Sequence, residues 1–185
     1  MCHPYQDTTD RKIYKVILTS NSMKNLEEFQ VEPEMISYLG LGGFGEVYRL
    51  TPPHAGKFLW YGDGKRLKIE QLQREKEIAK IAYEERISVP KPEGVFKVRH
   101  PKNRDMQPAL IMEYIEGLTL KDIYRREKES VSYYKVLRLA KEEIEKANKT
   151  KLIPAGDAVN SGNIIWCPEK EKVYLIDFGL WEVIE

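Results

Sequence analysis

The feature that most constrains the fold is a glycine-rich stretch, "MISYLGLGGFGEVYRL", with aromatic and β-branched residues on both sides of the glycines. Such a pattern predicts a strand, a tight turn and a second strand. Gly40, Gly42 and Gly45 have the spacing G-x-G-x-x-G, and Val47 follows two residues later. A dinucleotide-binding loop with this spacing opens a helix, whereas "EVYRL" predicts a strand. The glycines therefore indicate a β-hairpin.

The remaining pattern predicts an α+β fold with antiparallel sheets. After the hairpin, "TPPHAG" predicts a turn and "KFLWY" a third strand. A long amphipathic helix is expected over residues 62–90, with Pro90 and Pro92 ending it. Further strands are expected at "GVFKV" and "ALIMEYI", helices at "TLKDIYRREKE" and "SYYKVLRLAKEEIEKANK", and a strand hairpin at "NIIW" and "KVYLI". This order differs from the strand-helix alternation of a doubly wound sheet.

Length and composition bound the class of protein. At 185 residues and 42% hydrophobic content, one compact domain with up to two lobes is expected. Cys2 and Cys167 lack metal-ligand spacing, which favours a reducing compartment. No apolar run reaches the roughly 18 residues of a membrane span, and the N-terminus lacks the apolar core of a signal peptide. We therefore expect a cytoplasmic protein without a membrane segment. Upstream of the hairpin, "YKVILTS" predicts a strand and "SMKNLEEF" a short helix.

The formal net charge of +1 argues against binding nucleic acid by bulk electrostatics alone. Inside a β-hairpin, G-x-G-x-x-G-x-V instead matches the loop that covers the ATP phosphates in protein kinases, where missing side chains let backbone N–H groups approach the anion. A glycine-rich hairpin without a ligand is the alternative. The long helix carries Glu75 and Glu77, and one glutamate of the corresponding kinase helix pairs with a lysine. Counting back from "SVPKP" favours Glu77, and a solvated charge is the expectation for Glu75.

Two later stretches carry residue types that phosphoryl transfer uses. "GDAVNSGNIIW" places Asp157 ahead of Asn163 and a strand, like a loop in which an aspartate accepts the substrate hydroxyl proton and an asparagine binds Mg²⁺. "IDFG" supplies Asp177 as a metal carboxylate, fourteen residues beyond the asparagine. Together with the hairpin, the helix and the strand "ALIMEYI", these stretches predict a site for ATP with Mg²⁺ or Mn²⁺.

Over roughly residues 35 to 182, this set resembles the protein-kinase-like superfamily. The compact form and "SVPKPEGVF" are similar to the RIO kinases and the small kinase of the KEOPS tRNA-modification complex, and more distantly to the aminoglycoside phosphotransferases. The resemblance implies a two-lobe fold, with an extension at 1–34, a sheet and one long helix in an N-lobe at 35–116, and a reduced helical C-lobe at 117–185. It implies that ATP contacts Gly40, Gly42, Gly43, Gly45, Val47, Met112, Glu113 and Ile115.

The sequence departs from the kinase pattern at two places within the site. If "HAG" is a turn, hydrophobic residues occupy the expected position of the phosphate-binding lysine. Lys57 is the preferred candidate, because "HAGK" has an alanine two positions earlier that faces the same side of a strand. Lys65, Lys68 and a merely solvated Lys57 are the alternatives. In the catalytic loop, Ala155 replaces a histidine and Asn163 follows Asp157 by six positions instead of five. Asn160 is therefore a second candidate metal ligand.

The leading expectation is an atypical Ser/Thr-kinase-like phosphotransferase that uses Asp157, Lys57 and Glu77 on a protein or small-molecule acceptor. Only "LWEVIE" follows Gly179, so a conventional peptide groove is not expected. The alternative is a pseudokinase, a nucleotide-binding or scaffold module that keeps the fold but transfers phosphate poorly. A third expectation is membership of an RNA-associated assembly. The basic residues of "KVRHPKNR" fit this idea, and they also fit a solvated loop.

Overall fold

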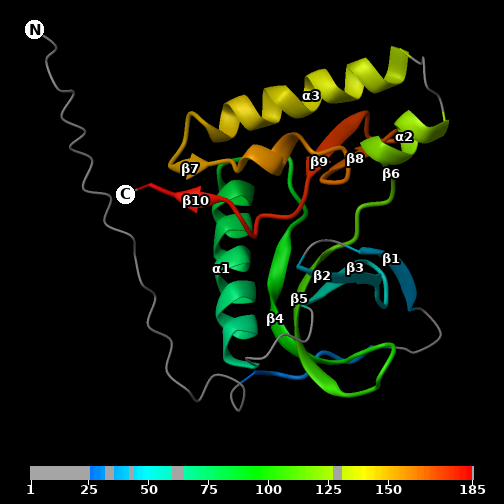
Figure 1. Ribbon diagram of the computed structural model, residues 1–185, viewed down its shortest axis with the longest axis vertical. Coiled ribbons are helices and arrows are strands. Elements are labelled where there is room, and N and C mark those ends of the chain that lie inside the picture. Colours follow the sequence, from blue (N-terminus) through cyan, green and yellow to red (C-terminus); the bar gives the residue numbers. More distant parts are fainter. Residues whose placement is uncertain (1–25, 32–35, 42–43, 60–64, 127–130, 185) are drawn as a thin grey trace, which may run out of the picture.

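The computed structural model describes residues 26–31, 36–41, 44–59, 65–126 and 131–184, which form a mixed α+β structure with antiparallel sheets and few helices (Figure 1). The strands are β1 (Ser37–Leu41), β2 (Gly45–Arg49), β3 (His54–Leu59), β4 (Pro92–Arg99), β5 (Met106–Glu113), β6 (Leu118–Thr119), β7 (Leu152–Ile153), β8 (Ile164–Cys167), β9 (Lys172–Leu175) and β10 (Glu182–Val183). The helices are α1 (Lys65–Glu84), α2 (Leu120–Arg126) and α3 (Val131–Ala147), with a 3₁₀ helix at Gly156–Val159.

The largest sheet contains five antiparallel strands in the order β1-β2-β3-β5-β4. Val47 pairs with Lys57, which in turn pairs with Leu110. Since side chains alternate between the two faces of a sheet, these three residues share one face. Glu46 and Phe58, which also pair, lie on the opposite face. One face of the sheet therefore carries the Lys57 ammonium group, and the other carries the Glu46 carboxylate.

The third strand begins earlier than the sequence pattern predicts. The pattern predicts a turn at "HAG", but β3 starts at His54 and includes all three residues. The reason is strand pairing: Ala55 and Gly56 pair with β2 on one side and with β5 on the other. Gly56 also leaves room for a neighbour, because a Cβ atom on it would lie 2.8 Å from Leu50 Cδ1. The last two residues of the predicted strand, Trp60 and Tyr61, lie outside the described residues.

The described part of the N-terminal segment is extended. Residues 26–31 contain none of the helix predicted for "SMKNLEEF"; instead Phe29 N–H donates to the Lys97 carbonyl and Lys97 N–H to the Glu27 carbonyl, both at 2.9 Å. The Phe29 ring lies 5.6 Å from that of Phe96, between centroids. Apolar packing against β4 thus outweighs local helix propensity. The predicted strand "YKVILTS" lies outside the described residues.

Helix α1 packs beside β4 and β5, on the face of the sheet that carries Lys57 (Figure 1). Leu72 of the helix joins Leu59 and Leu110 in a small buried cluster between the two layers. The opposite face of the sheet has its own apolar cluster, which contains Tyr48, Leu50, Phe58, Val98, Ala109 and Ile111. Helix α1 therefore covers the Lys57 face of the sheet. The side of the helix that faces the sheet decides which of its side chains contact Lys57.

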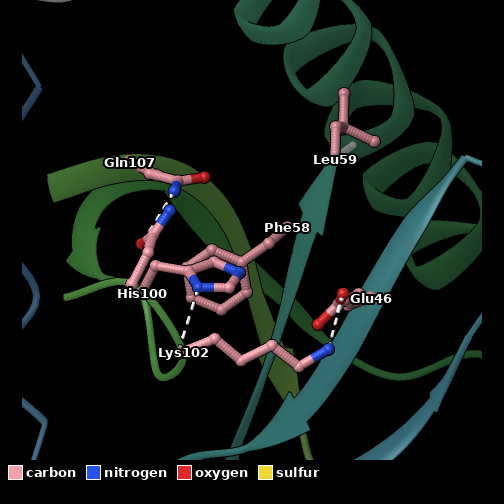
Figure 2. A pocket seen from close by; sticks show the side chains of 7 residues that line it. Glu46, Phe58, Leu59, His100, Lys102 and Gln107 are labelled. Atoms are coloured by element: carbon pink, nitrogen blue, oxygen red, sulfur yellow. Dashed lines mark hydrogen bonds and ion pairs between the residues drawn. The ribbon is translucent and has the colours of Figure 1, made fainter. Parts of the chain in front are cut away.

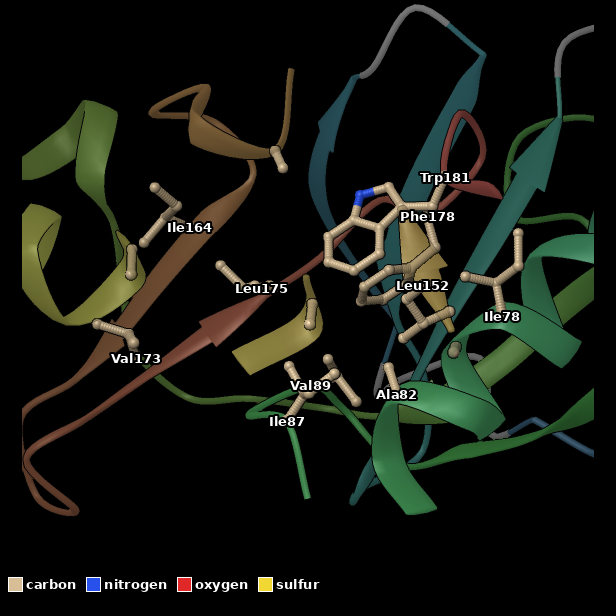
Figure 3. Close-up of a cluster of buried hydrophobic side chains, with 14 of the residues drawn as sticks. Ile78, Ala82, Ile87, Val89, Leu152, Ile164, Val173, Leu175, Phe178 and Trp181 are labelled. Carbon is tan, nitrogen blue, oxygen red and sulfur yellow. The ribbon is translucent and has the colours of Figure 1, made fainter. Parts of the chain in front are cut away.

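The C-terminal half contains α2, α3 and two small antiparallel sheets, β6-β8-β9 and β7-β10. The predicted hairpin of "NIIW" and "KVYLI" is confirmed as β8 and β9, whereas the sequence pattern does not predict the two-residue strands β6, β7 and β10. A large buried core joins this half to the end of α1, with Phe178 and Trp181 packed near Ile78 and Leu152 (Figure 3). Among the described helices, none has the length and apolar character to cross a membrane.

Candidate functional site

Lys57 lies at a junction of three segments that are distant in sequence. Its Nζ atom on β3 is 2.7 and 2.8 Å from the two carboxylate oxygens of Glu75 on α1, and 2.8 Å from Oδ1 of Asp177, which follows β9. Only 7% of the Lys57 side chain and 2% of the Glu75 side chain are exposed, against 23% for Asp177. The fold thus brings two carboxylates onto one buried ammonium group.

Burial and ion pairing shift the pKa of Lys57 in opposite directions. Burial by itself would lower the pKa of the Lys57 ammonium, but the charges of Glu75 and then Asp177 outweigh it and hold that pKa above the usual value. Burial raises the pKa of the Glu75 carboxyl, an effect that Lys57 opposes. When all three groups are ionised, the cluster carries one net negative charge. It can therefore accept a further cation beside the most exposed member, Asp177.

The predicted pairing of Glu77 with the lysine is wrong. The Glu77 side chain is 58% exposed and contacts the neighbouring Lys76 at 2.6 Å. Helical spacing explains the difference: Leu72, Glu75 and Ile78 recur at intervals of three residues and are all buried. Glu75 therefore lies on the stripe that faces the sheet, and Glu77 lies outside it. This periodicity is the sequence signal that points to Glu75.

Lys57 is the lysine that the described residues place against these carboxylates. The side chains of the alternatives, Lys65 and Lys68 at the start of α1, lie outside the described part of the structure. Lys57 and Ala55 lie on the same face of β3, as the spacing in "HAGK" predicts, and Val47 of β2 lies across from Lys57 on this face.

The base of the glycine hairpin is tightly packed. A Cβ atom on Gly45 would lie 2.1 Å from the Phe58 carbonyl oxygen, so no side chain fits there. Gly40 of β1, in contrast, has open space on this side: a Cβ atom added to it would have nothing within 4 Å. Gly42 and Gly43, at the tip of the predicted hairpin, lie outside the described residues. Of these two glycines, close packing therefore requires the absence of a side chain at Gly45 but not at Gly40.

The loop between β7 and β8 connects Asp157 to Asn163. Asn163 Nδ2 donates to the Asp157 carbonyl at 3.2 Å, and Ile176 N–H donates to the Asn163 carbonyl at 2.9 Å. Asn163 therefore lies beside the chain immediately before Asp177. Asn160 uses its side-chain oxygen to accept the Gly162 N–H at 3.0 Å. Of the two candidate ligands, Asn163 is the one tied by its backbone to the residue before Asp177, and its hydrogen bond to Asp157 uses the side-chain nitrogen and not the oxygen.

Asp157 has a buried carboxylate oxygen with no hydrogen-bond partner among the described residues. The residue lies in the 3₁₀ helix Gly156–Val159, and the atom concerned is Oδ1. Buried polar atoms are normally satisfied, whereas Asp157 Oδ1 is an acceptor that no described donor uses.

The chain turns sharply at Asp177 and is then anchored. Asp177 has φ 67°, a left-handed conformation that is uncommon outside glycine and that concentrates at functional sites. Phe178 and Trp181 are buried in the main core with ring centroids 5.0 Å apart, and Arg74 Nη2 of α1 donates to the Trp181 carbonyl at 3.0 Å. These contacts anchor the chain that follows Asp177, and its carboxylate contacts Lys57. Sequence reasoning missed Arg74 and Trp181, and nothing in the local pattern marks the arginine.

Three residues predicted to contact ATP, Met112, Glu113 and Ile115, lie in different environments. Met112 pairs with Ala55 and shares the face of Lys57, whereas Glu113 ends β5 and its N–H donates to the Lys91 carbonyl at 2.9 Å. Ile115 is buried in a separate small cluster with Cys167 and Tyr174, next to β8 and β9. The side chain of Ile115 therefore packs in the interior.

Two cavities of the described structure lie away from Lys57. One is on the opposite face of the five-stranded sheet, and the other lies between α3 and β9. The described residues also contain no group of three His, Cys, Asp or Glu side chains placed to hold a metal ion by themselves. No protein-family model matches the chain, and a comparison with curated proteins finds no match either. The function is therefore argued from the geometry around Lys57.

Proposed function

We propose that the protein is an ATP- and Mg²⁺-dependent phosphotransferase of the protein-kinase-like kind. The observation that carries the proposal is the buried contact of Lys57 with both Glu75 and Asp177. In protein kinases, a lysine of the third strand pairs with a glutamate of the adjacent helix, and an aspartate from "DFG" holds the metal. Residue types, element types and chain order all agree with that arrangement.

On this proposal, the sheet β1–β5 and α1 form an N-lobe, and α2, α3 and β6–β9 form a C-lobe. The stretch from Glu113 to Gly117 is the hinge. Nucleotide lies against the Lys57 face of the sheet, under Val47 and beside Met112, with the phosphates toward Lys57. Because phosphoryl transfer needs mainly positioning and charge neutralisation, a rigid lysine held by two carboxylates suits the task.

Asp157 has the chemistry of the residue that orients the acceptor. Its carboxylate accepts the proton of an acceptor hydroxyl as the hydroxyl oxygen bonds to the γ-phosphorus of ATP; the bond to the β,γ-bridging oxygen breaks, and ADP leaves. Asn163, through its bond to the Asp157 carbonyl, holds this loop in place.

The residues present fit a divalent cation. Mg²⁺ is usually held by one or two carboxylates together with substrate phosphates and water, so a complete protein cage is not required. Asp177 provides a partly exposed carboxylate in a cluster with net negative charge, and Asn163 provides an amide oxygen nearby. When bound, Mg²⁺ neutralises charge on the phosphate oxygens.

The test is turnover of ATP, measured as ADP release and autophosphorylation with Mg²⁺ or Mn²⁺. Asp157→Ala and Asp177→Ala should each reduce the rate by at least about a hundredfold, the usual contribution of acid–base or charge-stabilising groups. Glu77→Gln is the matched control and should keep the wild-type rate, whereas Glu75→Gln should not. Equal activity of the wild type and both aspartate variants would rule out the proposal.

A second candidate is a nucleotide-binding module with little turnover. The longer spacing from Asp157 to Asn163, together with Ala155 at the usual histidine position, favours it. Thermal denaturation distinguishes the two candidates, because ATP at a hundredfold excess over its Kd stabilises a protein by about 2.7 kcal/mol. Stabilisation without ADP release identifies the module, and stabilisation with release identifies the enzyme.

A further inference from the structure

A second ion pair, between the buried Glu46 and the exposed Lys102, lies at the base of the glycine hairpin, on the opposite face of the sheet from Lys57. Glu46 directly follows Gly45 and is 6% exposed. One of its carboxylate oxygens accepts the Tyr48 hydroxyl, and the other lies 2.8 Å from Lys102 Nζ. Lys102 comes from the turn between β4 and β5 and extends past the rings of His100 and Phe58 to reach Glu46 (Figure 2).

The turn that carries Lys102 is itself well held. His100 N–H donates to the Asp105 carbonyl at 2.8 Å, and Arg104 N–H donates to the His100 carbonyl at 2.9 Å. The backbone N–H of Lys102 donates to His100 Nδ1 at 3.2 Å. The His100 ring packs edge-to-face on Phe58, with centroids 4.8 Å apart. Lys102 therefore projects from a rigid platform, although its own side chain is 61% exposed.

This arrangement connects the turn to the strand that leaves the glycine hairpin. Gly45 is packed against the Phe58 carbonyl, so the chain at this point has little freedom to shift. The Lys102 ammonium, followed by the Tyr48 hydroxyl, holds the pKa of Glu46 below its usual value, which keeps Glu46 ionised. A buried carboxylate that loses its cation must move toward water or rearrange its surroundings. Loss of the Lys102 contact would therefore remove one of two restraints on the start of β2, the other being the packing of Gly45 against β3.

We propose that Glu46 and Lys102 are positioning residues that hold the backbone of Gly45, at the start of β2, in place beside the phosphates of a nucleotide. The inference rests on the proposed function, since it assumes that nucleotide binds on the Lys57 face. Neither residue touches the nucleotide; both act from the far face of the sheet through the backbone of Gly45. The positioning therefore concerns the phosphate end of the ligand and leaves the nucleoside end unchanged.

The experiment compares the Kd of ATP with that of adenosine by isothermal titration calorimetry, for the wild type, Lys102→Met, Lys102→Arg and Lys80→Met. Lys80 makes an exposed ion pair with Glu84 at 3.9 Å, so Lys80→Met is a matched loss of one paired lysine far from the hairpin. Lys102→Met should raise the Kd of ATP on the order of fivefold, as expected for indirect coupling between residues. The Kd of adenosine should stay within about twofold of the wild-type value. Lys102→Arg should restore most of the ATP affinity.

The ratio of the two Kd values separates positioning from general destabilisation, which would weaken both ligands alike. An unchanged ratio in Lys102→Met, with wild-type ATP binding intact, overturns this inference and leaves the proposed function standing. Wild-type protein that binds neither ligand overturns both. An equal loss of ATP affinity in Lys80→Met would also overturn the inference, because the effect would then not depend on Glu46.

Discussion

Lys57 is the residue on which the site depends most, because it is the cation shared by a buried and a partly exposed carboxylate. Lys57→Met should lower the free energy of unfolding by about 3 kcal/mol, since it leaves the Glu75 charge buried without its cation. Adding Glu75→Gln should recover at least half of this loss, whereas adding Glu77→Gln should change stability by no more than about 0.5 kcal/mol. Urea denaturation of the wild type and these variants measures this, and equal effects of the two glutamine substitutions would contradict the pairing.

Tyr48 gives the second residue-scale prediction. Burial, followed by its bond to Glu46, raises the pKa of its hydroxyl to about 12, from a usual value of about 10. The folded state thus keeps the proton to higher pH than the unfolded state. This contribution to stability is complete below pH 10 and is lost as the pH rises toward 12. Between pH 9 and pH 11, the free energy of unfolding should fall by about 1 kcal/mol more in the wild type than in Tyr48→Phe.

Urea denaturation at the two pH values provides the measurement. Tyr124→Phe, which removes a hydroxyl from a half-exposed ring, is the control and should keep the pH dependence of the wild type. If the free energy of unfolding fell equally in Tyr48→Phe and the wild type between the two pH values, the hydroxyl of Tyr48 would not be the group responsible.

At the scale of elements, the strand β2 depends on a glycine at its first position. Gly45→Ala would place a methyl group 2.1 Å from the Phe58 carbonyl oxygen, and because that atom belongs to the backbone, β2 and β3 must separate. We expect a loss of about 1 to 3 kcal/mol, the range seen for overpacked sites. Gly40→Ala, with open space around the added methyl group, should stay within about 0.5 kcal/mol. Similar losses for both variants in urea would contradict this view of the hairpin.

Elements with strong periodicity were predictable, and elements set by tertiary contacts were not. The long helix and the hairpin of β8 and β9 follow from patterns of apolar residues, although α1 ends at Glu84 and not at the predicted Pro90. The start of β3 does not, because "HAG" has a turn-like composition and Gly56 serves the packing of Leu50. The segment at 26–31 has helix-forming residues, yet it lies along β4 because Phe29 packs against the apolar cluster there. Strands β7 and β10 have two residues each, which is too short for a sequence pattern.

At the scale of the whole molecule, the candidate site was predictable as a set of residue types and less so as a set of contacts. Asp177 follows from motif order, whereas the spacing of "HAGK" alone favours Lys57 over Lys65 and Lys68. The structure brings Lys57 and Asp177 within 2.8 Å across 120 positions of the chain. Glu75 does not follow, because counting from a proline ignores which side of the helix faces the sheet. Arg74 contacts a backbone carbonyl, an interaction that any exposed arginine could make and that no pattern announces.

Trp181 connects the site to the rest of the molecule, since its ring lies in the core shared by α1, β7 and the segment after Asp177 (Figure 3). Its indole Nε1 is buried without a hydrogen-bond partner among the described residues. Trp181→Phe therefore loses no hydrogen bond there and should cost about 1 to 2 kcal/mol for the smaller ring, whereas Trp181→Ala should cost about 3 to 5 kcal/mol. Leu180→Ala, at a half-exposed neighbour, should change the free energy of unfolding by no more than about 1 kcal/mol.

Because the same ring fixes the chain after Asp177, Trp181→Ala should also weaken ATP binding in the presence of Mn²⁺. Calorimetric Kd values and urea midpoints measured on the same samples test both effects, and a Trp181→Phe variant as unstable as Trp181→Ala would show that the indole nitrogen is satisfied in solution.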